Sequence, residues 1–120
     1  MKYKILFLFF VQITFSQVDE TKNIMKQAND AFLASDFKLA KELYQNSIEL
    51  DPNNKDAWYN LAVAEFNLNE NENACEHLYN VYKLGDYLVH KEILKNCPDF
   101  RNGTIFSIAD VQEKPKFIYE

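Results

Sequence analysis

The side chains that could do chemistry gather in residues 74–97, which hold both cysteines, Cys75 and Cys97, and both histidines, His77 and His90. A redox pair normally has C-x-x-C spacing at a helix N-terminus, whereas 21 residues separate these cysteines. Zinc needs four converging ligands, and the C-x-H spacing is not an established ligand pair. A redox or metal site is therefore disfavoured, and no cofactor is expected. A disulfide and a pair of buried free thiols both remain.

The N-terminus predicts export. Lys2 and Lys4 precede an apolar run over residues 5–11, and small residues follow as far as Ser16. This is the layout of a secretory signal peptide spanning residues 1–16. A membrane anchor is the alternative, but a span needs roughly 20 apolar residues. Cleavage after Ser16 would deliver the chain to an oxidising compartment, where disulfides persist.

The charge of the chain argues against two classes of partner. Removing residues 1–16 takes away Lys2 and Lys4 and no acidic residue, which changes the net charge from −5 to −7. An acidic protein gains nothing from phosphate backbones, so nucleic acid is not an expected partner. An anionic membrane surface is disfavoured for the same reason, and membrane insertion is not expected once the leader is removed.

The pattern of apolar residues predicts an all-α fold. Two glycines and three prolines are too few to punctuate a protein of many short strands. Apolar residues instead recur at i, i+3, i+4 and i+7, and Glu65 is the only charged member of the third such stripe. We expect five helices joined by tight turns, at residues 19–34, 37–50, 54–68, 71–84 and 86–96.

The sequence also repeats itself with a period of 34 residues. Aligning Thr21 with Lys55 pairs Ala28 with Ala62, Phe32 with Phe66, Ala40 with Ala74, and Ser47 with Val81. The segments "AFLASDFKLAKELYQNSIELDPNN" and "DAWYNLAVAEFNLNENENACEHLYNVY" resemble tetratricopeptide repeats, in a variant common in exported bacterial proteins. The resemblance implies a periplasmic stack of about 2.5 helix–turn–helix repeats. Its helical domain would span residues 19–97, with repeats at about 21–54 and 55–84 and a capping helix at 86–96.

The same resemblance suggests how the cysteines pair. In such a stack, helices 71–84 and 86–96 pack antiparallel with axes roughly 8–10 Å apart. Cys75 lies early in the first helix and Cys97 at the end of the second, so the two come level. A disulfide needs Cα atoms about 4.4–6.8 Å apart, which this packing allows. A structural disulfide is the prediction, with two buried free thiols as the alternative.

The first helices of tetratricopeptide repeats line a concave face that commonly binds an extended peptide. The resemblance therefore implies a groove for a protein or peptide partner. Asn29 and Asn60 match positions that bind a C-terminal carboxylate in peptide-clamping relatives, but Met25 stands where those relatives have a lysine. A carboxylate clamp is thus a narrower alternative to a general groove. The candidate groove residues are Lys22, Met25, Lys26, Asn29, Leu33, Asp56, Tyr59, Asn60, Val63 and Asn67.

Residues 98–120 read as an irregular, extended tail. Within it, "IFSIADVQEKPKFIYE" looks like the lead-in of TonB-type C-terminal domains, which would place a further module after Glu120. No nucleophile–base–orienter set stands out in the chain. The main hypothesis is a non-enzymatic periplasmic protein that mediates protein–protein interaction through the groove. The alternative is a fragment or accessory module of a TonB-type energy-transducing transport protein.

Overall fold

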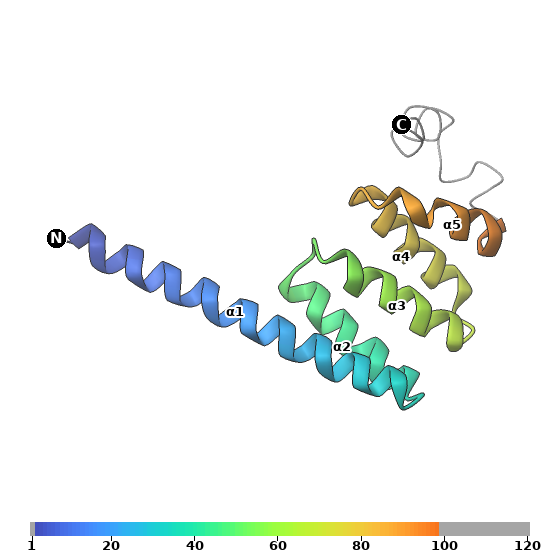
Figure 1. Ribbon diagram of the computed structural model, residues 1–120, viewed down its shortest axis with the longest axis horizontal. Helices are drawn as coiled ribbons and strands as arrows, with labels where there is room; N and C mark the ends of the chain where they lie inside the picture. The colour runs from blue at the N-terminus through green and yellow to red at the C-terminus, as the bar shows by residue number, and fades with distance from the viewer. Residues whose placement is uncertain (1, 99–120) are drawn as a thin grey trace.

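The computed structural model describes the backbone of residues 2–98 and the side chains of residues 17–98. This part of the chain is helical and contains no strand, which confirms the all-α prediction. The helices follow one another side by side in a stack (Figure 1). They are α1 (Lys2–Leu33), α2 (Phe37–Leu50), α3 (Lys55–Asn67), α4 (Asn71–Lys83), the short 3-10 helix η1 (Tyr87–Val89) and α5 (His90–Asn96).

The 34-residue period is visible in the backbone of two turns. Ser35, between α1 and α2, has φ 60°, and Asn69, between α3 and α4, has φ 61°. These are left-handed conformations, which non-glycine residues adopt mainly in turns that end a helix. The next residue, Asp36, accepts a hydrogen bond from the backbone N–H of Leu39 at 3.1 Å and so caps α2. Glu70, at the matching position before α4, makes no side-chain cap, but its N–H donates to the Glu65 carbonyl as that of Asp36 does to Ala31. The two helix pairs are therefore folded back by turns with the same backbone conformation.

The turn between the two pairs has a different chemistry. The helix α2 ends at Leu50, with Asp51 as its C-cap, and Pro52 comes next; because a proline has no N–H to donate to a preceding turn, the helix cannot continue past it. Asn54 then caps α3 by accepting from the backbone N–H of Ala57 at 3.1 Å. Trp58 Nε1 also donates to the Pro52 carbonyl at 2.8 Å. These contacts fix the start of α3 relative to the end of α2.

Small residues stand where the helices pack. Ala28, Ala40, Ala62 and Ala74 are all completely buried. They belong to α1, α2, α3 and α4 in turn, and the helices pack as α1 on α2, α2 on α3, and α3 on α4. A methyl side chain allows two helices to approach closely, since interaxial distance depends on the side chains at the contact. The period in the sequence is thus a period in helix contacts.

The third helix contributes to both apolar cores. Ala57, Leu61 and Ala64 of α3 join a cluster with α1 and α2, which includes Tyr44. Ala62 joins a second cluster with α4, η1 and α5, whose members include Ala74, Cys75, Leu78, Val81, Tyr82, Val89, Ile93 and Cys97. Because α3 is buried on two sides, it connects the two halves of the stack.

The structure differs from the sequence-based prediction at both ends. The first helix begins at Lys2 rather than near residue 19, because no glycine or proline interrupts residues 2–33. The last predicted helix is divided into η1 and α5, after a turn in which Gly85 has φ +98°. No helix within residues 2–98 is long and apolar enough to cross a membrane. Leader cleavage stays a prediction, and the TonB-like tail lies outside the described residues.

The two cysteines lie at disulfide distance. Cys75 and Cys97 are joined, with their Cα atoms 5.7 Å apart, and both side chains are buried. Cys75 is in the first half of α4 and Cys97 directly follows α5, so the bond ties the short terminal helix to the repeats. This arrangement supports the disulfide over the two free thiols.

Removing this disulfide should destabilise the protein. The bond closes a loop with a sequence separation of 22 residues. The chain-entropy model then gives about 3 kcal/mol of stabilisation. We expect Cys75→Ala/Cys97→Ala to lower the free energy of unfolding by about that amount in urea titrations followed by circular dichroism. A reductant should destabilise only the parent protein, and equal stability of parent and variant would contradict the structural role.

Candidate functional site

Side-chain hydrogen bonds join the first helices of the repeats directly to one another. Asn60 Nδ2 on α3 donates to Asn29 Oδ1 on α1 at 3.3 Å. On the other side of α3, Tyr59 Oη donates to Glu92 Oε1 on α5 at 3.3 Å. Both contacts bypass α2 and α4. The helices α1, α3 and α5 therefore form one surface, which we call the α1/α3/α5 face.

A shallow, open pocket of about 430 Å³ lies at the N-terminal end of this face. Within it, Lys26 Nζ is 2.8 Å from Asp30 Oδ2. This hydrogen bond, together with the charge of Asp30, raises the pKa of Lys26. The half-buried Met25 supplies an apolar surface beside the charged pair. The pocket is lined by Thr21, Lys22, Met25, Lys26, Asn29, Asp30 and Asn54.

The predicted groove residues of α1 separate into two groups. Lys22, Met25, Lys26 and Asn29 line the pocket together. Leu33 does not; it lies at the end of α1 with 82% of its surface exposed. The pocket thus lies along residues 21–30 of α1 and stops short of the helix's last turn.

The predicted groove residues of α3 also have different surroundings. Asn60 contacts Asn29, and Tyr59 contacts Glu92. Burial and the neighbouring Glu92 carboxylate raise the pKa of Tyr59. The remaining three do not join this network: Asp56 is exposed in the first turn, Val63 is half-buried, and Asn67 Nδ2 donates to the Val63 carbonyl of its own helix at 2.8 Å.

The structure adds two residues that the sequence analysis did not assign to the groove. Asn54 caps α3 and reaches the pocket because the N-terminus of α3 lies beside α1. Tyr44 on α2 is 1% exposed and donates from Oη to Asn29 Oδ1 at 2.6 Å. Burial raises the pKa of Tyr44, and a hydrogen bond with Asn60 opposes that rise. A buried tyrosine hydroxyl needs a polar partner, and this requirement is the feature of the sequence that could have pointed to a contact between Tyr44 and the groove.

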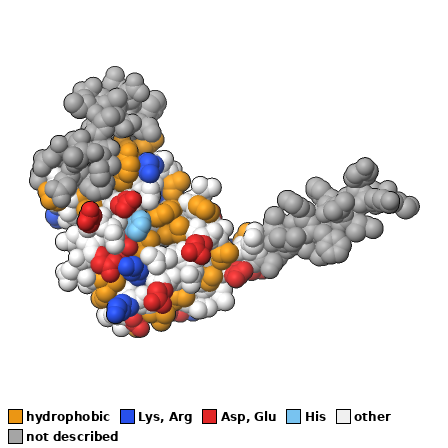
Figure 2. All heavy atoms as spheres, turned by 180° about the vertical axis from the view of Figure 1, so that it is seen from behind, with side chains coloured by type: hydrophobic (Ala, Val, Ile, Leu, Met, Phe, Trp, Pro, Cys, Tyr) orange, Lys and Arg blue, Asp and Glu red, His pale blue; other side chains and the backbone are white. Residues whose placement is uncertain are grey.

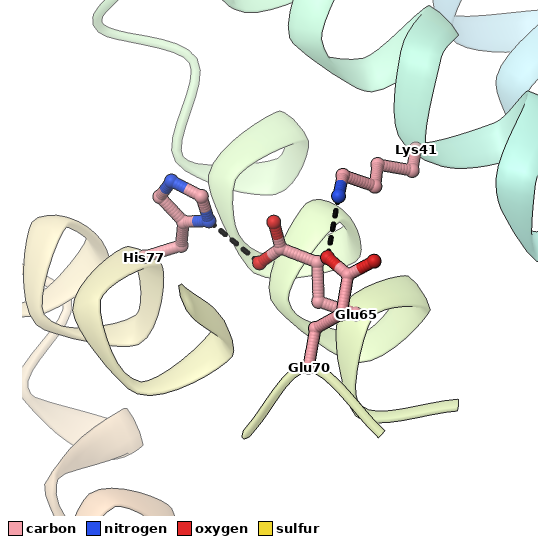
Figure 3. Close-up of polar contacts among 4 residues, drawn as sticks. All are labelled: Lys41, Glu65, Glu70 and His77. Carbon is pink, nitrogen blue, oxygen red and sulfur yellow. Dashed lines mark hydrogen bonds and ion pairs between the residues drawn. The ribbon is translucent and has the colours of Figure 1, made fainter. Parts of the chain in front are cut away.

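A buried carboxylate lies between α3 and α4. Glu65 is 1% exposed, and its Oε2 is 2.6 Å from Nδ1 of His77 on α4 (Figure 3). The Trp58 ring packs against the His77 ring with centroids 5.4 Å apart. Glu65 Oε1 has no hydrogen-bond partner among the described residues. Since a buried carboxylate without partners is unfavourable, His77 is the group that makes Glu65 tolerable in this interface.

A second polar contact joins α2 to the turn before α4. Lys41 Nζ pairs with Glu70 Oε2, close to the Glu65–His77 pair (Figure 3). The hydrogen bond from Lys41 lowers the pKa of Glu70, although burial acts in the opposite direction. On the face seen in Figure 2, acidic and basic side chains are interspersed among apolar ones. The Lys41–Glu70 pair thus connects α2 to the start of α4.

The histidines and cysteines do not assemble a metal site. His77 is engaged by Glu65, and the two cysteines are joined to each other. Over residues 17–98, no three His, Cys, Asp or Glu side chains come close enough together to hold a metal ion.

Antiparallel helix pairs with a 34-residue period and one shared open face define a helical-repeat protein. Residues 43–76, from α2 into the first half of α4, match the family model of the tetratricopeptide repeat. The chain therefore contains a tetratricopeptide repeat, as the sequence predicted. A comparison with curated proteins found no match. The repeat indicates a scaffold for protein–protein interaction.

The Glu65–His77 pair can be tested by a double-mutant cycle. We expect His77→Ala to lower the free energy of unfolding by about 2 kcal/mol, because it leaves a buried carboxylate without its partner. Glu65→Ala places at this position the residue type found at Ala31, one repeat earlier. The double variant should lose less stability than the sum of the two single variants in urea titrations. Additive losses would show that the two side chains are not coupled.

The Lys41–Glu70 contact predicts a pH dependence. Because the pKa of Glu70 is lowered in the folded state, its carboxylate stabilises the fold above the ordinary value of 4.5. That contribution is lost as the pH falls through the lowered pKa. The difference in unfolding free energy between the parent and Glu70→Gln should therefore shrink between about pH 5 and pH 3. Exposed Glu49→Gln is the matched control, and a pH-independent difference for Glu70→Gln would refute the coupling.

Proposed function

We propose that this chain is an exported, non-enzymatic scaffold whose α1/α3/α5 face binds an extended segment of a partner protein. The observation that carries the proposal is the open pocket beside the Asn29–Asn60 contact. Its lining combines an apolar side chain, amide groups and charged groups, which suits a polypeptide. The tetratricopeptide repeat over residues 43–76 supports the same class of function.

The rigidity of the face favours this role. Side chains of α1, α3 and α5 are already joined before any partner binds, through Asn60 to Asn29 and through Tyr59 to Glu92. A surface that is ordered in advance loses less conformational entropy on binding. A pocket that is shallow and open, rather than enclosed, also fits a docked segment better than a small substrate.

Two features support export to the periplasm. The leader-like residues 1–16 precede the repeats, and the Cys75–Cys97 disulfide needs an oxidising compartment to persist. If residues 1–16 are removed, α1 would begin near Gln17 and still contain every α1 residue that lines the pocket.

The binding face can be tested by affinity capture from a bacterial envelope extract. The protein should retain a partner that Tyr59→Ala/Asn60→Ala loses, because the double variant removes both links between the first helices. Gln45→Ala/Asn46→Ala, at exposed positions of α2, is the matched control and should keep the partner. Loss of the partner from the control, or its retention by the first variant, would refute the assignment of the face.

Export can be tested separately by mass spectrometry of the protein expressed with its full N-terminus in a bacterial host. We expect a mature chain that begins at Gln17 and is recovered in the periplasmic fraction. An intact N-terminus in the cytoplasmic fraction would overturn the location and leave the binding face to be judged by capture.

A further inference from the structure

We propose that Tyr44 is a positioning residue that fixes the Asn29 amide so that its N–H groups face the pocket and donate to backbone carbonyl oxygens of the partner segment. The inference deepens the proposed function and rests on it. Its basis is a three-residue contact in which α1, α2 and α3 each supply one side chain: Asn29, Tyr44 and Asn60.

The hydrogen bonds determine which side of the Asn29 amide is available. Its Oδ1 accepts from Tyr44 Oη at 2.6 Å and from Asn60 Nδ2 at 3.3 Å. A carboxamide oxygen has two lone pairs, so both are used within the protein. The Nδ2 group keeps two donors. Since Asn29 is exposed and lines the pocket, those donors are the groups it can offer to a ligand.

Reversing this amide alone would lose a hydrogen bond. If Nδ2 of Asn29 pointed inward while Asn60 kept its orientation, Nδ2 would face the amide nitrogen of Asn60, which cannot accept. Only a reversal of both amides together would restore that contact, and it would leave the buried Tyr44 hydroxyl without Asn29 Oδ1 as its acceptor. Tyr44 strengthens the preference, because its hydroxyl is buried and makes the shorter of the two bonds. Tyr44, which lies on α2 behind the face, therefore determines that Asn29 presents its N–H groups to the pocket.

The side chain one turn before Asn29 favours an uncharged acceptor. Lys26 is already paired with Asp30, and Lys22 also lines the pocket, so the lining as a whole does not repel an anion. Met25, however, stands where carboxylate-binding relatives have a lysine, and a backbone carbonyl needs no such cation. The half-buried Met25 adds apolar contact for a neighbouring side chain of the segment. Carbonyl and carboxylate oxygens share the acceptor chemistry, so the experiment must separate them.

The positioning role can be measured without a ligand. In ¹⁵N- and ¹³C-labelled protein, Tyr44→Phe should shift the Asn29 side-chain amide and Cγ resonances while the backbone spectrum of α3 is kept. Tyr87→Phe removes the same hydroxyl group from a tyrosine that packs on Tyr82 at the other end of the stack, and it should leave Asn29 unchanged. Unshifted Asn29 side-chain resonances in Tyr44→Phe would overturn the positioning role.

The donor role needs a ligand, and the probe is a phage-displayed library of random 12-residue peptides. Each peptide is fused to the coat protein through its C-terminus, so no free carboxylate is presented there. A selected peptide, synthesised with an amidated C-terminus, should bind the parent protein. Tyr44→Phe should weaken it about 3- to 10-fold, as expected for the loss of one ordering hydrogen bond.

Asn29→Asp gives the sharper comparison. An aspartate still accepts from Tyr44 and Asn60, so the internal contacts and the stability should be kept. The atom that faces the pocket becomes an acceptor, and binding of the amidated peptide should fall by at least about 10-fold. Unchanged binding by Asn29→Asp would refute the donor role.

The remaining outcomes separate the inference from the proposed function. Binding of the free-acid peptide but not its amide would show that the ligand is a carboxylate, contrary to the inference. If no displayed peptide binds the parent, the proposed function is overturned, and the resonances of Asn29 alone decide whether Tyr44 orients the amide.

Discussion

The close approach of neighbouring helices at alanine is the constraint on which the rest of the structure depends. Ala28, Ala40, Ala62 and Ala74 are completely buried, one in each of the four repeat helices. A larger side chain at any of these positions would have to displace a helix, since protein interiors are close-packed. The short separation also brings α1 and α3 near enough for Asn60 to reach Asn29. The α1/α3/α5 face is therefore a consequence of how the second helices pack against the first.

Alanine contacts bring helices together, but they do not determine which helix packs against which. The polar pairs supply that specificity. Glu65 occupies the position that Ala31 has in the first repeat, and its partner His77 lies on α4. A carboxylate in that place is tolerable only when α3 meets the helix that carries the histidine. Lys41 and Glu70 connect α2 to the following turn in the same way. Each pair ties one element of the stack to one neighbour.

The parts of the fold that could be predicted are those that a local sequence pattern determines. The apolar pattern predicted α2 with its observed bounds, and the antiparallel packing implied by the repeat predicted the cysteine pair. The start of α1 was missed, because the leader composition predicts processing and does not itself stop a helix. The Tyr44–Asn29 contact was also missed. Periodicity places both side chains on the right helices, but whether a hydroxyl meets an amide depends on the lateral position of the helices, which the sequence does not encode locally.

The C-terminal end of the stack connects the disulfide with the α1/α3/α5 face. A helix of seven residues such as α5 is too short to be stable alone in water, so its position depends on tertiary contacts. The Cys75–Cys97 bond holds one end of it against α4, while Glu92 accepts a hydrogen bond from Tyr59 on the face. Without the covalent bond, α5 would lose a main restraint and Tyr59 would lose an ordered partner. The disulfide therefore also helps to complete the α1/α3/α5 face by holding α5 in place.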